Sequence, residues 1–422
     1  MPQDELSAGD VESPNVAAEL PSAEAIVEST EVETGNEPLT VDAVVRIAFA
    51  NHPDLQSAAA AVRREQHLIC QVTRGPNPTV GYLASEVGND GEAGQQGVFL
   101  SQNIVRGGKL YLNGQVQQRK VSVAHQQLEL RRLQLEADVR TSFLEVAVAQ
   151  ERRKLLLRLQ TPLDNAERSA QRLLQSGIIS GPSYSQARLE AQKNRMQIRR
   201  TETQLTYASA KLAALIGIPS RIESVRATAL LPDEELPDME QLSQRIQSLS
   251  PEVSLAASQY DRSHWQVRRE IAEPVPDLQT QWSLQQDAST NHTVVGIQLG
   301  VTLPVRNDNS GAINAARADT WRTHHDLQAV QRSLQQRLVA AYGTVQQADG
   351  QLEVINNELE ALARETLQKT QQAFSLGEAT YLDLLNAQRA YISLSLDTLD
   401  LYRQRAQAVV HLDTMLVRAG RR

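Results

Sequence analysis

Two adjacent histidines, His324 and His325, are the residues of this sequence that look most like a pair of metal ligands. On a helix, however, neighbouring side chains point about 100° apart, so they cannot hold one ion together as an i,i+4 pair can. The other histidines are scattered, and the single cysteine, Cys70, excludes an intrachain disulfide and a cysteine-based zinc site. We therefore predict no metal site and no cofactor.

Catalytic patterns are also missing from the sequence. It contains no GxSxG, Walker or GxGxxG motif, and no pairing of a nucleophile with a base can be argued from it. The net charge of −8 does not suit nucleic acid, because binding phosphates requires a basic surface. We predict that the chain is not an enzyme and has no nucleic-acid partner.

The first 38 residues differ in composition from the rest. Residues 1–38 contain ten Asp and Glu residues but no Lys or Arg, and they lack the apolar core of a signal peptide. Low hydrophobicity with charge of one sign is typical of disorder. We expect a disordered acidic tail, and no signal peptide is present in this sequence.

The remaining chain is an internal repeat. Pro53 matches Pro251 at an offset of 198 residues, and Gly177 matches Gly377 at an offset of 200. A nearly constant offset through the same order of Pro and Gly residues indicates a duplicated unit. The predicted organisation is a first repeat at 39–217, a linker at 218–237, a second repeat at 238–418 and a short basic tail at 419–422.

Each repeat has the same predicted parts. A helical stretch (41–75 and 238–272) precedes two extended segments, a very long helix (109–176 and 311–376) and a returning helix (183–216 and 380–418). At 1.5 Å per residue, each long helix would measure about 100 Å, which favours coiled-coil packing over a compact domain. In the first long helix, one apolar stripe contains Leu128, Leu135, Val139, Phe143 and Val146.

A glycine stands between the two helices of each hairpin. Residues 371–391 read QQAFSLGEATYLDLLNAQRAY, a helical pattern interrupted at Gly377, and Gly177 holds the same place in the first repeat. Because glycine readily adopts the left-handed conformation that ends a helix, we predict a sharp reversal at both positions. Ser183 and Thr380 are the predicted N-caps of the returning helices.

The clearest extended segment, His292–Val305, alternates an apolar face with a face of Gly, Gln and Thr. Its expected partner is Asp277–Gln285. One interpretation is that these hairpins cover a helical core, and the other is that they span a membrane with the apolar face toward lipid. The almost uncharged opposite face suits a water-filled lumen. The predicted lipid-facing residues are Val295, Ile297, Leu299, Val301 and Leu303.

Membrane-spanning strands would require an oligomer. Four strands cannot close a barrel, and an open sheet edge cannot persist in lipid. Single-chain barrels begin at about eight strands, so several copies would have to share theirs, and three copies would give twelve.

These parts resemble the TolC-like outer-membrane efflux proteins over about residues 39–418. The similarity is carried by LSQNIVRGGK (100–109), LGVTLPVRNDNSGAINAARA (299–318), SGIIS (176–180) and LGEATYLDLLNAQRAY (376–391). The resemblance implies a mainly α fold with a small β portion, in which a homotrimer forms an α-helical barrel capped by a shared 12-stranded β-barrel. It also implies a channel in the outer membrane that extends into the periplasm and works with a periplasmic adaptor and, indirectly, an inner-membrane pump of the RND or ABC type.

The resemblance further implies site residues. Two acidic residues often follow the second tip glycine in this family, and here Asp383 occupies the first position whereas Asn386 stands at the second. Asp383 would otherwise be a surface residue favoured by the helix dipole. The implied tunnel entrance contains Tyr381, Asp383 and Asn386. The implied adaptor-facing tips are Ser176, Gly177, Ile178, Ile179 and Ser180 in the first repeat, and Leu376, Gly377, Glu378, Ala379 and Thr380 in the second.

A soluble coiled-coil scaffold without channel activity is the alternative hypothesis. The acidic N-terminus and the missing signal peptide favour it, whereas the apolar stripe from Val295 to Val305 opposes it.

Overall fold

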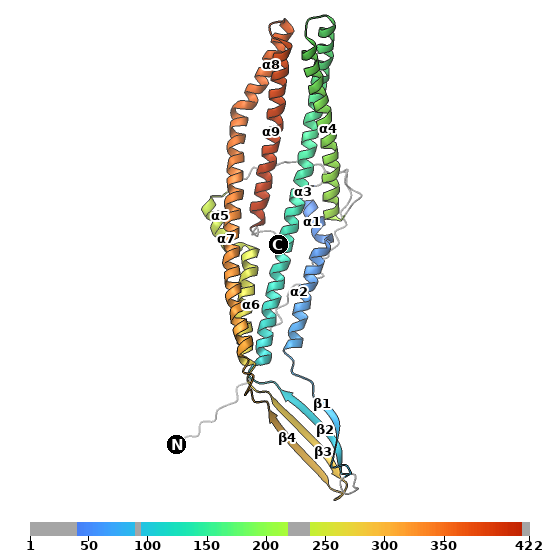
Figure 1. The fold of residues 1–422 in the computed structure, drawn as a ribbon, viewed down its shortest axis with the longest axis vertical. Coiled ribbons are helices and arrows are strands. Elements are labelled where there is room, and N and C mark those ends of the chain that lie inside the picture. The colour runs from blue at the N-terminus through green and yellow to red at the C-terminus, as the bar shows by residue number, and fades with distance from the viewer. Residues whose placement is uncertain (1–39, 89–93, 218–236, 416–422) are drawn as a thin grey trace, which may run out of the picture. The chain divides into compact units, whose positions relative to one another are not determined.

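The structure is a computed structural model, shown in Figure 1. The predicted tails at 1–38 and 419–422 and nearly all of the predicted linker lie outside the residues it describes. Those residues are 40–88, 94–217 and 237–415.

Both halves of the described chain contain the same order of elements, and the fold is mainly helical with one small sheet, as predicted. The first half consists of α1 (Val41–Asn51), α2 (Pro53–Val72), β1 (Thr79–Ser85), β2 (Gln95–Ile104), α3 (Lys109–Gln175) and α4 (Gly181–Ile216). The second consists of α5 (Met239–Leu249), α6 (Pro251–Ala272), β3 (Leu278–Asp287), β4 (Thr293–Val301), α7 (Ser310–Val354), a π-helix (Ile355–Leu359), α8 (Glu360–Leu376) and α9 (Tyr381–Thr414).

Each repeat begins with two short helices where one helical stretch was predicted. The breaks fall at His52 and Ser250, whose backbones are extended (ψ 121° and 127°). Both residues precede a proline, and the proline ring disfavours the helical conformation of the residue before it. The proline itself then occupies the first turn of the next helix, where its missing N–H is not needed.

The two long helices differ. The helix α3 is continuous over 67 residues as predicted, although Pro162 lies inside it. The prediction of one continuous α-helix over 311–376 is wrong, because residues Ile355–Leu359 form a π-helical turn between α7 and α8. A π turn has i→i+5 hydrogen bonds in place of i→i+4, and it leaves no simple signal in the apolar spacing. No membrane-spanning helix is found among the described residues.

The apolar core runs along the long helices. The five predicted stripe residues of α3 are all buried, and most of them pack against α1, α2 and α4. A second cluster joins α5, α7 and α9 around Leu334 and Leu338. A third cluster contains Leu144 and Val148 of α3 together with Leu399 and Ala406 of α9, so the two repeats share part of their core.

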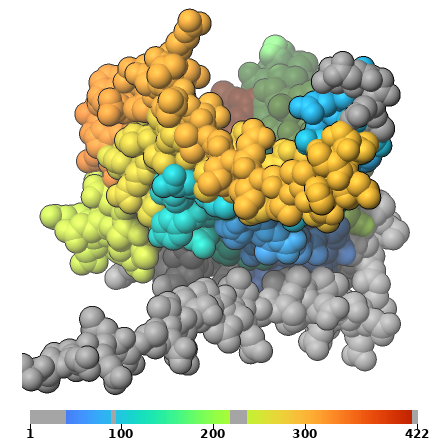
Figure 2. Space-filling model, turned by 90° about the horizontal axis from the view of Figure 1, so that it is seen from below, coloured from blue at the N-terminus to red at the C-terminus, as the bar shows by residue number. Residues whose placement is uncertain are grey.

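The four strands form one antiparallel sheet in the order β1-β2-β3-β4, at the opposite end of the described chain from the helix reversals (Figure 1). Both repeats contribute to this end, as the blue-to-cyan and yellow-to-orange residues of Figure 2 show. β4 ends at Val301, before Leu303 and Pro304, where the sequence predicted a strand to Val305. Proline has no N–H to donate to a neighbouring strand. β3 continues two residues beyond the predicted Gln285.

Candidate functional site

The helix reversals have the predicted left-handed glycines, with φ of 76° at Gly177 and 78° at Gly377. Each reversal is closed by backbone hydrogen bonds, for example from Ile178 N to Leu173 O at 2.9 Å and from Glu378 N to Ala373 O at 2.9 Å. The two tips have the same turn because left-handed backbone at the end of a helix allows these bonds.

The two predicted N-caps have different outcomes. Thr380 caps α9 as expected, since its side chain accepts a hydrogen bond from Asp383 N. Ser183 is not the cap of α4, because this helix already begins at Gly181 and its N-cap is Ser180. Pro182 fits the first turn and moves the start of the helix ahead of Ser183. The Ser183 hydroxyl lies 3.1 Å from the Ser180 hydroxyl instead.

The ten predicted tip residues show the same exposure in both hairpins. Ile179 and Ala379, each two residues after the tip glycine, are half-buried, and the other eight tip residues are exposed. The side chains with the greatest apolar exposure are Ile178, at 69%, and Leu376, at 72%. Each tip therefore exposes one large apolar side chain to solvent.

Asp383 forms a capping box with Thr380 at the second tip. Its Oδ2 accepts hydrogen bonds from Thr380 N at 2.9 Å and from the Thr380 hydroxyl at 2.6 Å. These bonds, first that of the side chain and then that of the backbone, hold the pKa of Asp383 below its ordinary value. Asn386 is exposed one helical turn further on, so the structure brings these two implied entrance residues to one exposed face of α9.

The capping box should make the second tip sensitive to acid. A carboxylate whose pKa is lowered by folding stabilises the folded form above its unfolded pKa, and this stabilisation is lost as the pH falls through the folded pKa. We expect the amide protons of Thr380 and Asp383 to keep their protection from hydrogen exchange from pH 7 down to about pH 4, and to lose it as the pH falls further, after correction for intrinsic rates. The variant Asp383→Asn should have weaker protection at pH 7 without that pH dependence, and an unchanged pH dependence in the variant would contradict this assignment.

Tyr381 does not share the exposed face of Asp383 and Asn386. Only 5% of its surface is exposed, and its hydroxyl donates a hydrogen bond to Ala166 O on α3 at 3.1 Å. Its ring lies in a cluster with Ala170 and Ala187 of the first hairpin. Burial, aided by the charge of Glu167, raises the pKa of Tyr381 to about 12, so the phenol remains a hydrogen-bond donor at neutral pH.

An ion pair reinforces this attachment of the second hairpin to the first. The Arg389 guanidinium on α9 lies 2.7 Å from Oε1 of Glu190 on α4. Glu190 is largely buried, which strengthens the interaction relative to that of an exposed pair. We call the contacts Tyr381–Ala166 and Arg389–Glu190 the tip latch. No motif in the sequence points to the tip latch, because the partners lie 215 and 199 residues apart.

The predicted lipid-facing residues are exposed on the described chain. Ile297 is 68% exposed, and it lies directly opposite Trp282, which is on the same face of the sheet. The exposed fractions of Val295, Leu299, Val301 and Leu303 lie between 49% and 69%. The interpretation in which this face covers a helical core is therefore wrong, since the exposed face covers no helix among the described residues.

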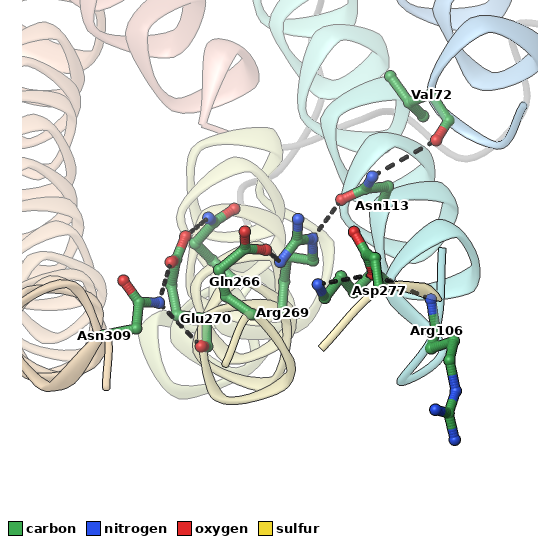
Figure 3. A network of polar contacts seen from close by, with 10 residues as sticks. Val72, Arg106, Asn113, Gln266, Arg269, Glu270, Asp277 and Asn309 are labelled. Carbon is green, nitrogen blue, oxygen red and sulfur yellow. Dashed lines mark hydrogen bonds and ion pairs between the residues drawn. The ribbon is translucent and has the colours of Figure 1, made fainter. Parts of the chain in front are cut away.

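A polar network fastens the base of the sheet to the helices, as Figure 3 shows. Asp277, just before β3, accepts hydrogen bonds from Lys109 Nζ at 2.9 Å and from Arg106 N at 3.0 Å. Arg269 on α6 donates to Asn113 on α3 at 2.5 Å. Because a buried ammonium group is costly without a partner, Asp277 allows Lys109 to be buried where the two repeats meet.

The two adjacent histidines both contact one glutamine of the next helical turn. Gln328 contacts both rings, with its Nε2 3.1 Å from His324 Nε2 and its Oε1 3.2 Å from His325 Nδ1. Within the described ranges, no group of three His, Cys, Asp or Glu side chains is placed to hold a metal ion.

The long helical hairpins, the exposed apolar face of the sheet and the exposed hairpin tips together define a class of protein. The chain matches the family described as Outer membrane efflux protein over residues 44–218 and 242–417, and it therefore belongs to that family. The prediction of an outer-membrane efflux channel is confirmed, and the family consists of channels and not of enzymes.

Individual relatives agree with this assignment. The chain is 26% identical over 390 residues to the cobalt-zinc-cadmium resistance protein CzcC of Cupriavidus metallidurans, with 90% of each chain covered. Its fold is similar to that of CusC (TM-score 0.75, 16% identity, 89% of this chain and 91% of the other). It is also similar to that of the outer membrane protein VceC of Vibrio cholerae (TM-score 0.73, 16% identity, 88% and 94%).

Proposed function

We propose that three copies of this chain form a passive export duct, in which their sheets close a twelve-stranded barrel in the outer membrane and their helices continue it into the periplasm. The observation that carries the proposal is the sheet itself. One face is apolar and exposed, the other is polar and almost uncharged, and β1 and β4 are edge strands among the described residues. Open edges are not tolerated in lipid, whereas closure by neighbouring copies removes them.

The hairpin tips form the entrance of the duct in this proposal. Ile178 and Leu376 provide exposed apolar contacts for a periplasmic adaptor, which connects the duct to an inner-membrane pump. Asp383 and Asn386 line the closed entrance. Tyr381 has another role, since a buried side chain offers little surface to a tunnel: it belongs to the latch that keeps the second hairpin against the first.

Divalent metal ions are the cargo that we propose first, because the relative CzcC is named for resistance to cobalt, zinc and cadmium. Between the strand ends, the described residues of the polar face carry no carboxylate or thiolate that would retain metal ions, which is compatible with the passage of hydrated ions.

Export in cells tests the proposal. A strain without this chain should accumulate the cargo of its pump and become sensitive to it, and the wild-type chain should restore tolerance only when the adaptor and pump are present. Cobalt, zinc, cadmium and a panel of organic toxicants would be compared. Restored tolerance without the pump would contradict a passive duct, and tolerance to organic compounds alone would contradict the metal cargo.

A further inference from the structure

The polar face of the sheet contains four glycines, and each lies directly opposite a larger side chain. Glycine weakens a strand because it loses more backbone entropy on folding than other residues and contributes no side chain to packing. Four glycines on one face therefore require a physical reason. The cross-strand pairs are Gly81 with Phe99, Gly97 with Gln285, Gly296 with Ser283 and Gly300 with Gln279.

At two of these pairs, the opposite side chain occupies the space above the glycine. A Cβ atom at Gly81 would lie 2.5 Å from Cε1 and 2.6 Å from Cζ of Phe99. A Cβ atom at Gly296 would lie 2.5 Å from the Ser283 hydroxyl oxygen. Neither glycine has a positive φ. The backbone conformation therefore does not require glycine at these positions, whereas the space occupied by the opposite side chain does.

The position of the Phe99 ring depends on the absence of a side chain at Gly81. Its ring lies across Gly81 along the wall of the sheet, and a methyl group at Gly81 would force the ring to move by about 1 Å to restore an ordinary carbon–carbon contact. Because the sheet blocks movement in the opposite direction, the ring would move away from the wall. Between the strand ends, the described residues of this face carry no charge, which leaves width as the property they can control.

We infer that Gly81 and Gly296 are size-determining residues of the duct: they are recesses that hold the opposite side chains against the wall and keep the barrel lumen wide. The inference rests on the proposed function, since it requires the polar face to line a lumen. The cargo class it implies is selected by size and not by charge within the barrel.

The test uses planar bilayers and the full-length trimer in a background where the tip latch is broken by Tyr381→Phe and Arg389→Ala, so that the entrance does not limit the current. Gly81→Ala should lower the open-channel conductance and should exclude smaller polyethylene glycols than the background does. Adding Phe99→Ala to Gly81→Ala should restore the conductance, because the displaced ring is gone. Gly343→Ala on α7, where a Cβ atom would meet open space, is the matched control and should change nothing.

The outcomes separate the inference from the function on which it rests. If the background forms no channel at all, the proposed function fails. If the background conducts but Gly81→Ala has the same conductance and polymer cut-off, the inference is overturned and the glycine has only a packing role. A loss of conductance that Phe99→Ala does not restore would overturn it as well. If Gly81→Ala gives no trimer, Gly296→Ala is measured in the same way, and an unchanged conductance there overturns the inference.

Discussion

Replacing Ile297 with arginine is expected to abolish the recovery of assembled protein from the outer membrane. Ile297 is 68% exposed on the apolar face near the middle of β4. An arginine on the lipid-facing side of a barrel costs about 2–4 kcal/mol at the bilayer midplane, and three copies would cost about 6–12 kcal/mol. This is comparable to the whole stability of many domains, about 5–15 kcal/mol.

The adjacent residue provides the matched control. Gln298 lies on the polar face, where it is paired with Gln281, and Gln298→Arg should therefore assemble at close to the wild-type level. Both variants would be compared by the amount of trimer in floated membranes on gels run without heating. Equal recovery of the two variants would show that this sheet does not have one face toward lipid.

Breaking the tip latch is expected to open the duct. Removing the Tyr381 hydroxyl eliminates its hydrogen bond to Ala166 O, and Arg389→Ala eliminates the ion pair with Glu190. In the proposed duct these contacts together would stabilise the closed arrangement by about 2 kcal/mol, which corresponds to a roughly 30-fold rise in the open population when both are lost. Open probability in planar bilayers measures this change for Tyr381→Phe combined with Arg389→Ala.

Two controls make the latch experiment specific. Arg364→Ala removes an exposed ion pair with Glu360 on α8 and should leave the open probability unchanged, because such pairs contribute little. Exchanging the charges of Arg389 and Glu190 should restore a large part of the closure. A doubly substituted channel that stays closed as often as the wild type would show that these contacts do not hold the entrance shut.

Much of the fold follows from local patterns in the sequence. The two tip glycines and the period-2 alternation in 292–305 are local features, and the offset of about 200 residues is found by comparing the two halves of the sequence. Each of them predicted a feature of the structure. The π turn at Ile355–Leu359 and the end of β4 at Val301 were not predicted. Both depend on details of backbone hydrogen bonding to which apolar spacing is insensitive.

The site was less predictable because its contacts are long-range. The tip residues are contiguous, so a motif can point to them. The contacts of Tyr381 with Ala166, of Arg389 with Glu190 and of Lys109 with Asp277 each join residues more than 160 positions apart. Each of these contacts depends on how distant segments pack, and the residue types alone do not indicate which residue is the partner. Tyr381 was expected at the entrance because it is close to Asp383 in the sequence. A helix turns about 100° per residue, however, so residues two positions apart lie on nearly opposite faces.

The oligomeric state of the full-length chain, measured by native mass spectrometry after extraction from membranes, tests the central claim most directly. A duct built from shared strands predicts a complex of three chains that requires detergent to stay in solution, because the closed barrel presents its apolar face outward. A folded, monodisperse single chain that remains in solution without detergent would contradict it.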